Sequence, residues 1–173
     1  PTQIKMRLDV IPIFLLANLL HLSVAKVCGK DHEDSWVGSC KNGAPNGKGT
    51  YTYSSGDVYV GEMKEGLRNG NGKLTLANGE IYVGNWIDNF RDGQGIHTWP
   101  SGAKYEGQYK GGKRHGKGKM IWSENHFYDG DWMDDERCGT GVFEWPDGER
   151  YEGEFKSGGR SGRGVSVGAD GER

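Results

Sequence analysis

The sequence is poor in proline and cysteine, and it has no excess of either charge. Its 173 residues include 5 prolines and 3 cysteines, and its formal net charge at pH 7 is −2. Such a chain lacks the surplus of lysine and arginine that neutralises phosphates, so we expect no nucleic-acid partner. The cysteines form no CxxC pair, and an odd number of them cannot complete a disulfide framework.

Recognisable catalytic and metal-binding motifs are also lacking. The chain contains no GxSxG nucleophile motif and no HExxH metal motif. The segment GGKRHGK at 111–117 matches the start of a nucleotide-binding P-loop, but Gly118 stands where that loop needs Ser or Thr to hold magnesium. We therefore predict a protein that is not an enzyme, with no cofactor, no metal site and no ATP or GTP binding.

No apolar run is long enough to indicate a transmembrane helix. Residues 10–25, VIPIFLLANLLHLSVA, fall short of the roughly 20 apolar residues needed and are interrupted by Pro12, Asn18 and His21. Residues 1–25 therefore suit a signal peptide or signal anchor, with Ser23-Val24-Ala25 as a cleavage site. The alternatives are an apolar helix that caps the first open edge of a sheet, and translated upstream sequence.

These alternatives decide the expected location. A signal predicts the secretory pathway, with an extracellular or membrane-associated protein, and residues 26–35 as a linker. Without a signal we expect a cytoplasmic, membrane-associated protein. In an oxidising compartment Cys28 and Cys40 can pair, which leaves Cys138 free. The first residue is Pro, which indicates a fragment or extra residues before Met6.

Glycine and aromatic residues are abundant, and they recur with a fixed period. From residue 36 the chain divides into six blocks of 23 residues without insertion. The blocks are 36–58, 59–81, 82–104, 105–127, 128–150 and 151–173. The third, twelfth and fourteenth positions are Gly in every block. The twenty-first is Gly in five blocks and Asn125 in the fourth, and both residue types tolerate positive φ. GGKRHGK is therefore the middle of block four.

Each block has the pattern of a β-hairpin. In YEGQY, residues 105–109, large and small residues alternate as in a strand. Residues 110–116, KGGKRHG, are predicted to reverse the chain, and GKGKMIW returns it with Gly118, Met120 and Trp122 on one face. His97 also falls at an inward position and is expected to pack with the rings. Because one hairpin is only marginally stable, stability must come from its neighbours.

The blocks YEGQYKGGKRHGKGKMIW and YEGEFKSGGRSGRG resemble the MORN repeat, whose pattern is Tyr-x-Gly-x-aromatic, a Gly turn and then Gly-x-Gly. The resemblance covers residues 36–173 and implies an all-β fold, an elongated, twisted, single-layer antiparallel sheet of stacked hairpins with a grooved aromatic face. Some positions depart from the pattern. Phe90 and Asp135 replace the mid-turn Gly, and Ser166 and Gly168 replace large residues, which predicts a weak or frayed sixth block.

The resemblance does not fix one function, because similar arrays accompany lipid kinases, membrane-junction proteins, ciliary spoke proteins and protein methyltransferases. We expect a scaffold for protein–protein contact or self-association. One alternative is a peripheral binder of anionic phospholipids such as phosphoinositides. Another is the regulatory repeat region of a larger enzyme, such as a lipid kinase, of which this chain is a truncated part.

Two sets of residues are the candidate binding surface. The tenth position of blocks two to six is always arginine, and stacked hairpins would place these side chains about 10 Å apart along the turn edge. They are Arg68, Arg91, Arg114, Arg137 and Arg160. Pairing with nearby carboxylates is the structural alternative. The candidate rings are Tyr105, Tyr109, Trp122, Tyr128, Trp132 and Trp145. Net charge runs from +1 in blocks one and two to +3 in the middle pair and −6 in the last pair.

Overall fold

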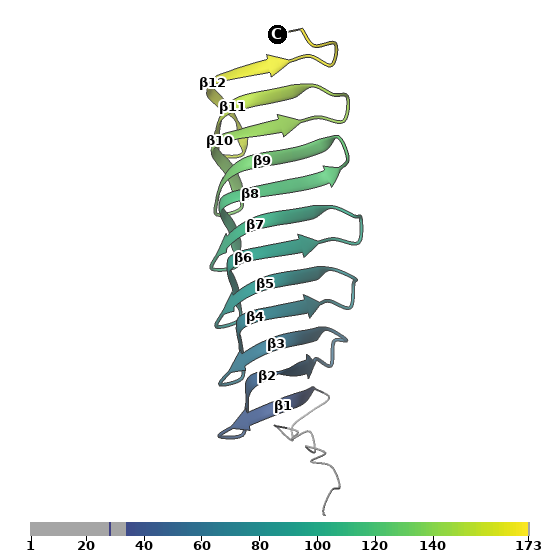
Figure 1. Ribbon diagram of the computed structural model, residues 1–173, viewed down its shortest axis with the longest axis vertical. Coiled ribbons are helices and arrows are strands. Elements are labelled where there is room, and N and C mark those ends of the chain that lie inside the picture. Colours follow the sequence, from purple (N-terminus) through teal and green to yellow (C-terminus); the bar gives the residue numbers. More distant parts are fainter. Residues whose placement is uncertain (1–27, 29–33, 173) are drawn as a thin grey trace, which may run out of the picture.

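The computed structural model describes residue 28 and residues 34–172, and these form a single sheet of twelve strands (Figure 1). The predicted signal segment, residues 1–25, lies outside the described residues. The strands are β1 Ser35–Lys41, β2 Ala44–Thr52, β3 Val58–Lys64, β4 Leu67–Thr75, β5 Ile81–Ile87, β6 Phe90–Thr98, β7 Lys104–Lys110, β8 Lys113–Ser123, β9 His126–Met133, β10 Glu136–Glu144, β11 Arg150–Lys156 and β12 Gly159–Val167. No helix within the described residues is long and apolar enough to cross a membrane.

Every strand pairs in antiparallel fashion with its neighbours in sequence, in the order β1 to β12. Figure 1 shows the hairpins stacked in one elongated layer, with the colour running along the long axis in chain order. The predicted all-β sheet of stacked hairpins is therefore confirmed. The sixth block, predicted to be weak or frayed, forms a paired hairpin of β11 and β12, although most of β12 is exposed.

The turns within blocks are tighter than the sequence predicted. Only Gly111 and Gly112, both with positive φ, lie between β7 and β8. Residues 113–116, predicted to belong to the reversal, already form β8. The segment GGKRHGK is thus a turn and a strand.

Two positions assigned to turns also differ from the prediction. In block three the turn residue is Asn89, with φ 71°, whereas Phe90 is the first residue of β6. Asp135, with φ 73°, does occupy the turn of block five. Asn125 does not adopt the expected positive φ, because β8 extends to Ser123 and shortens that turn.

The core is a row of rings on one face of the sheet, which we call the aromatic face. The first residue of each block is buried on this face: Trp36, Tyr59, Tyr82, Tyr105, Tyr128 and Tyr151. The ring of Tyr105 lies over the paired glycines Gly107 and Gly118, and its hydroxyl donates to the Gln108 carbonyl at 3.0 Å. The glycines are therefore needed because the ring occupies the space of a side chain.

In blocks three to six a second ring packs against the first ring of the preceding block. Trp132 contacts Tyr128 of its own block, with ring centroids 5.2 Å apart, and Tyr105 of the preceding block at 5.4 Å. Both contacts are edge-on, which is a favoured arrangement of aromatic pairs. The repeats are thus held together mainly by contacts between neighbouring blocks.

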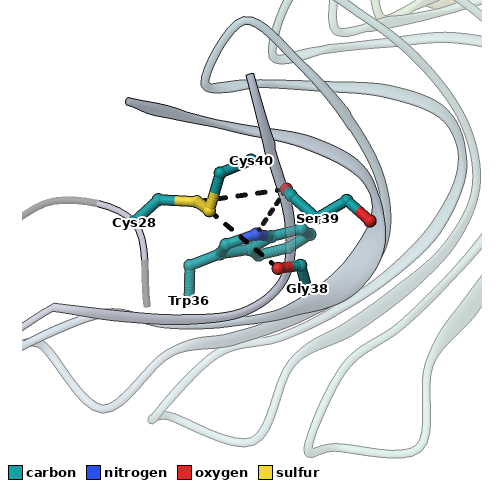
Figure 2. Close-up of a disulfide and its surroundings, with 5 residues drawn as sticks. All are labelled: Cys28, Trp36, Gly38, Ser39 and Cys40. Atoms are coloured by element: carbon teal, nitrogen blue, oxygen red, sulfur yellow. Dashed lines mark hydrogen bonds between the residues drawn. A yellow bond between two sulfur atoms is a disulfide. The ribbon is translucent and has the colours of Figure 1, made fainter. Parts of the chain in front are cut away.

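The first block has no preceding repeat, and a disulfide closes it. Cys40 stands where blocks three to six place the second ring, and it is joined to Cys28 beside the Trp36 ring (Figure 2). The indole N–H of Trp36 donates to the Ser39 carbonyl at 3.0 Å, and Trp36 is 0% exposed. The predicted pairing of these cysteines is present, and Cys138 is free. The disulfide therefore acts as an N-terminal cap on the array.

Candidate functional site: the aromatic–arginine face

Each of the five candidate arginines is the second residue of its strand, directly after the turn within its block, and its guanidinium lies over rings of the aromatic face. The short turn places Arg114 opposite Tyr109, so that both side chains emerge on the same face of the sheet. The row beside the turns is present as predicted, but Arg114 already belongs to β8, because the reversal ends two residues after Lys110. Rings and guanidiniums are one surface, which we call the aromatic–arginine face.

Each guanidinium lies over one or more rings. Arg114 is 4.3 Å from the ring centre of Trp132 in the next block and 5.8 Å from Tyr105 in its own block. Arg68 lies 4.4 Å from Trp86, Arg91 5.1 Å from Tyr109 and Arg137 5.8 Å from Phe155, each a ring of the next block. Arg160 instead lies 5.5 Å from Tyr151 of its own block and 5.1 Å from Trp145 of the preceding block. Cation–π contacts of this kind strengthen when they are shielded from water. The arginines thus help to join neighbouring blocks.

Two of the arginines are also held at their edges by the turn of the next block. The Asp135 carboxylate accepts hydrogen bonds from the Arg114 backbone N–H at 3.0 Å and from Arg114 Nε at 2.9 Å. The Asp135 backbone carbonyl accepts a third from Arg114 Nη2 at 3.0 Å. Asn89 holds Arg68 through the same atoms at 2.9, 3.2 and 3.3 Å. We call this three-bond arrangement the arginine clamp.

The charge of Asp135 suits this role. Burial acts to raise its pKa, but the hydrogen bonds and the charge of Arg114 outweigh burial, so the pKa of Asp135 lies below its usual value. The carboxylate is therefore ionised at neutral pH. The alternative of arginines paired with carboxylates holds for Arg114 and for Arg160, whose Nη1 lies 3.4 Å from Glu149.

The other two arginines face a glycine and have no clamp. The turn residue beyond Arg91 is Gly112, and the one beyond Arg137 is Gly158. Arg91 donates from Nη1 to His97 Nδ1 at 3.1 Å. The Arg137 guanidinium has no hydrogen bond or ion pair to any described residue, although burial lowers its pKa.

His97 is the one buried polar side chain of the aromatic face among the described residues. It stacks on Trp99 with centroids 4.1 Å apart, which confirms that it packs with the rings. Because a guanidinium only donates, Nδ1 must accept from Arg91, and Nε2–H then donates to Glu80 at 3.1 Å. Burial, reinforced by the charge of Arg91, lowers the pKa of His97. His97 is therefore neutral at pH 7 and fixed in one tautomer.

Two cavities lie on this face, each lined by one arginine without a clamp and by one clamped arginine, which is Arg68 in the first and Arg114 in the second. One, of about 380 Å³, is lined by Arg91, Gly112, Trp86, Phe90 and His97, together with other residues of blocks two and three. The other, of about 440 Å³, is lined by Arg137, Gly158, Trp122, Trp132 and neighbours in blocks four to six. Both are open to solvent. Each combines ring surface with a guanidinium, which suits a ligand that is both apolar and anionic.

The predicted rings divide into two groups. Tyr105, Tyr109, Tyr128 and Trp132 are buried and form the core of the face. Trp122 and Trp145 are half-buried at its margin, where Trp122 stacks on His126 at 4.6 Å and Arg160 lies 5.1 Å from Trp145. The sequence interpretation missed Asn89 and the clamp function of Asp135. The signal was present at the eighth position of the blocks, which alternates between Gly and Asn or Asp from block two onward.

Stacked hairpins, a shared row of rings and inter-block arginines define an open, single-layer β-repeat protein. The model of the MORN repeat matches residues 37–58, 59–81, 82–104, 105–126, 128–150 and 151–173, and the chain belongs to this family. MORN repeats are generally interaction or membrane-binding modules, and proteins built from them are typically non-catalytic. A search of curated proteins found no match.

Proposed function

We propose that this chain is a non-catalytic scaffold that holds a protein, either a different one or a second copy of itself, against the aromatic–arginine face. The observation that carries the proposal is the row of guanidiniums stacked over rings beside two open cavities. Aromatic residues and arginine are the side chains most enriched at the centres of protein interfaces. Phe90, 58% exposed at the rim of the first cavity, supplies an apolar anchor.

A peripheral role on anionic membranes is the alternative, and the geometry supports it less. Each basic side chain near an anionic membrane contributes about 1 kcal/mol when it reaches the head groups. Here the guanidiniums lie over rings inside the face, and two are already paired with carboxylates. The −6 charge of the last two blocks would also repel such a surface.

Co-sedimentation with vesicles that contain phosphatidylinositol phosphates tests this choice, at low and at physiological salt. The scaffold proposal predicts that the chain stays in the supernatant at both salt levels. Salt-sensitive sedimentation that is lost on joint Arg91→Ala and Arg114→Ala would favour the lipid alternative and overturn the proposal. Analytical ultracentrifugation of the same samples shows whether the protein partner is a second copy, because a dimer then appears as concentration rises.

A further inference from the structure

The array contains its own example of what binds the edge of these arginines. In block five the Asp135 carboxylate accepts hydrogen bonds from the backbone N–H and Nε–H of Arg114. In block three the Asn89 amide oxygen accepts from the same two groups of Arg68. Both acceptors are planar oxygen groups, and both come from the turn of the following block. The preferred ligand at this position is therefore visible in the same molecule.

Arg91 and Arg137 have the same setting without the acceptor. Gly112 and Gly158 have φ of 88° and 78°, close to the 71° of Asn89 and the 73° of Asp135. The backbone of the turn is thus retained, and only the side-chain oxygen is missing. A Cβ on Gly158 would have no neighbouring heavy atom within 4 Å, and one on Gly112 would meet only Phe90, at 3.6 Å.

The charges at these two positions are not compensated. No described carboxylate forms an ion pair with Arg91 or Arg137. Of the acids that line the cavities, Glu80 is engaged by His97 and Asp135 by Arg114, while Glu136 is exposed. An acidic group from outside the chain would complete both positions.

We propose that Arg91 and Arg137 are two carboxylate-binding positions that receive acidic side chains from an extended segment of the partner protein. This inference rests on the proposed scaffold function. The two positions are two blocks apart, which four strands at about 4.8 Å place roughly 19 Å from one another. An extended chain covers about 20 Å in roughly six residues. The segment that fits therefore carries two acidic residues at this spacing, with an apolar side chain near Phe90.

The test fills both positions from within the chain. Gly112→Asp combined with Gly158→Asp gives Arg91 and Arg137 the carboxylate acceptor that Asp135 provides to Arg114. Both glycines have a positive φ close to the one that Asp135 adopts. The control is Gly66→Asp, because Gly66 has a similar φ of 83° but its turn lies against Pro45, where no arginine is present. A melting temperature at or above that of the unmodified chain shows that the double variant folds.

The probe is a synthetic extended peptide with two glutamates separated by roughly six residues, which is about 20 Å. The control peptide carries glutamines in place of both glutamates. We expect the glutamate peptide to shift the NMR signals of the Arg91 and Arg137 Nε–H groups and to leave those of Arg68 and Arg114 in place. The double variant should bind it about tenfold more weakly or worse, as expected for loss of charge-assisted hydrogen bonds. Gly66→Asp should bind it normally.

Equal binding of the glutamine peptide, unchanged binding by the double variant, or shifts at Arg114 instead would each overturn the inference. Its failure can be distinguished from failure of the scaffold function. If the peptide does not bind and the vesicles do not sediment the chain, the carboxylate positions are wrong and the scaffold proposal stands. If the vesicles sediment the chain and the double variant alike, the scaffold proposal fails whatever the peptide does.

Discussion

At the scale of single residues, the array depends on glycines that make room for rings. An added Cβ on Gly107 would lie 2.5 Å from the Gly118 Cα and 2.7 Å from the Tyr105 hydroxyl oxygen. Neither neighbour can move easily, because one is backbone in a paired strand and the other is fully buried. By contrast, a Cβ on Gly159 would meet only the Lys156 carbonyl oxygen, at 3.8 Å.

We therefore expect Gly107→Val to destabilise the fold by about 1–3 kcal/mol, the usual effect of overpacking. Gly159→Val is the matched control and should change the melting temperature little. Thermal unfolding followed by circular dichroism measures both. An unchanged melting temperature for Gly107→Val would show that this glycine does not face the rings.

The arginine clamp makes a second prediction at the residue scale. Asp135→Gly restores the turn residue of blocks four and six and removes the clamp on Arg114. Because the pair is partly exposed, we expect a loss of about 1 kcal/mol at pH 7. The pKa of Asp135 is lowered in the fold, so its stabilisation is complete above its usual value of 3.8 and is lost as the pH falls through the lowered value.

Denaturant unfolding of Asp135→Gly and the unmodified chain at neutral and at acidic pH measures this difference. The two proteins should differ at pH 7 and converge in acid. A difference that stays constant down to the acidic limit would mean that the carboxylate charge contributes nothing.

At the scale of the hairpin, the repeat period of the sequence predicted the strands correctly but not the length of the turns. Rings and glycines at fixed positions predict strands on either side of a turn, because only alternation places both on one face. The extent of the turn was not readable, because KGGKRHG offers three glycines and the pattern does not say which ones reverse the chain. The contact of the arginines with the rings was therefore missed, since a shorter turn places Arg114 in the strand opposite Tyr109.

The first hairpin depends on its disulfide cap. Reduction should release Cys28 from Cys40 beside Trp36, expose the Trp36 indole and loosen β1, because no preceding block covers that ring. Hydrogen exchange with and without reductant measures the effect. We expect faster exchange in β1 and unchanged protection in β7 and β8. Cys40→Ser should behave as the reduced protein does, and equal protection of β1 in all samples would rule out a capping function.

At the scale of the whole molecule, the proposed binding surface is also the surface that holds the repeats together. The rings that join neighbouring blocks are also the base of the open face, and the arginines that bridge blocks present their edges to the two cavities. Within residues 34–172 the opposite face has no such row, and Val83, 46% exposed there, lies in a strand without buried neighbours on its side. We therefore propose the aromatic–arginine face of blocks two to six, and not the opposite face, as the binding surface.

Photo-crosslinking tests this central claim most directly. A photoreactive residue replaces Trp122, which lines the second cavity on the aromatic–arginine face, or, as the control, the exposed Val83 on the opposite face. The account predicts that position 122 crosslinks to a defined protein, a second copy or another chain, and that position 83 does not. Crosslinks that form equally from both positions, or only from position 83, would contradict it.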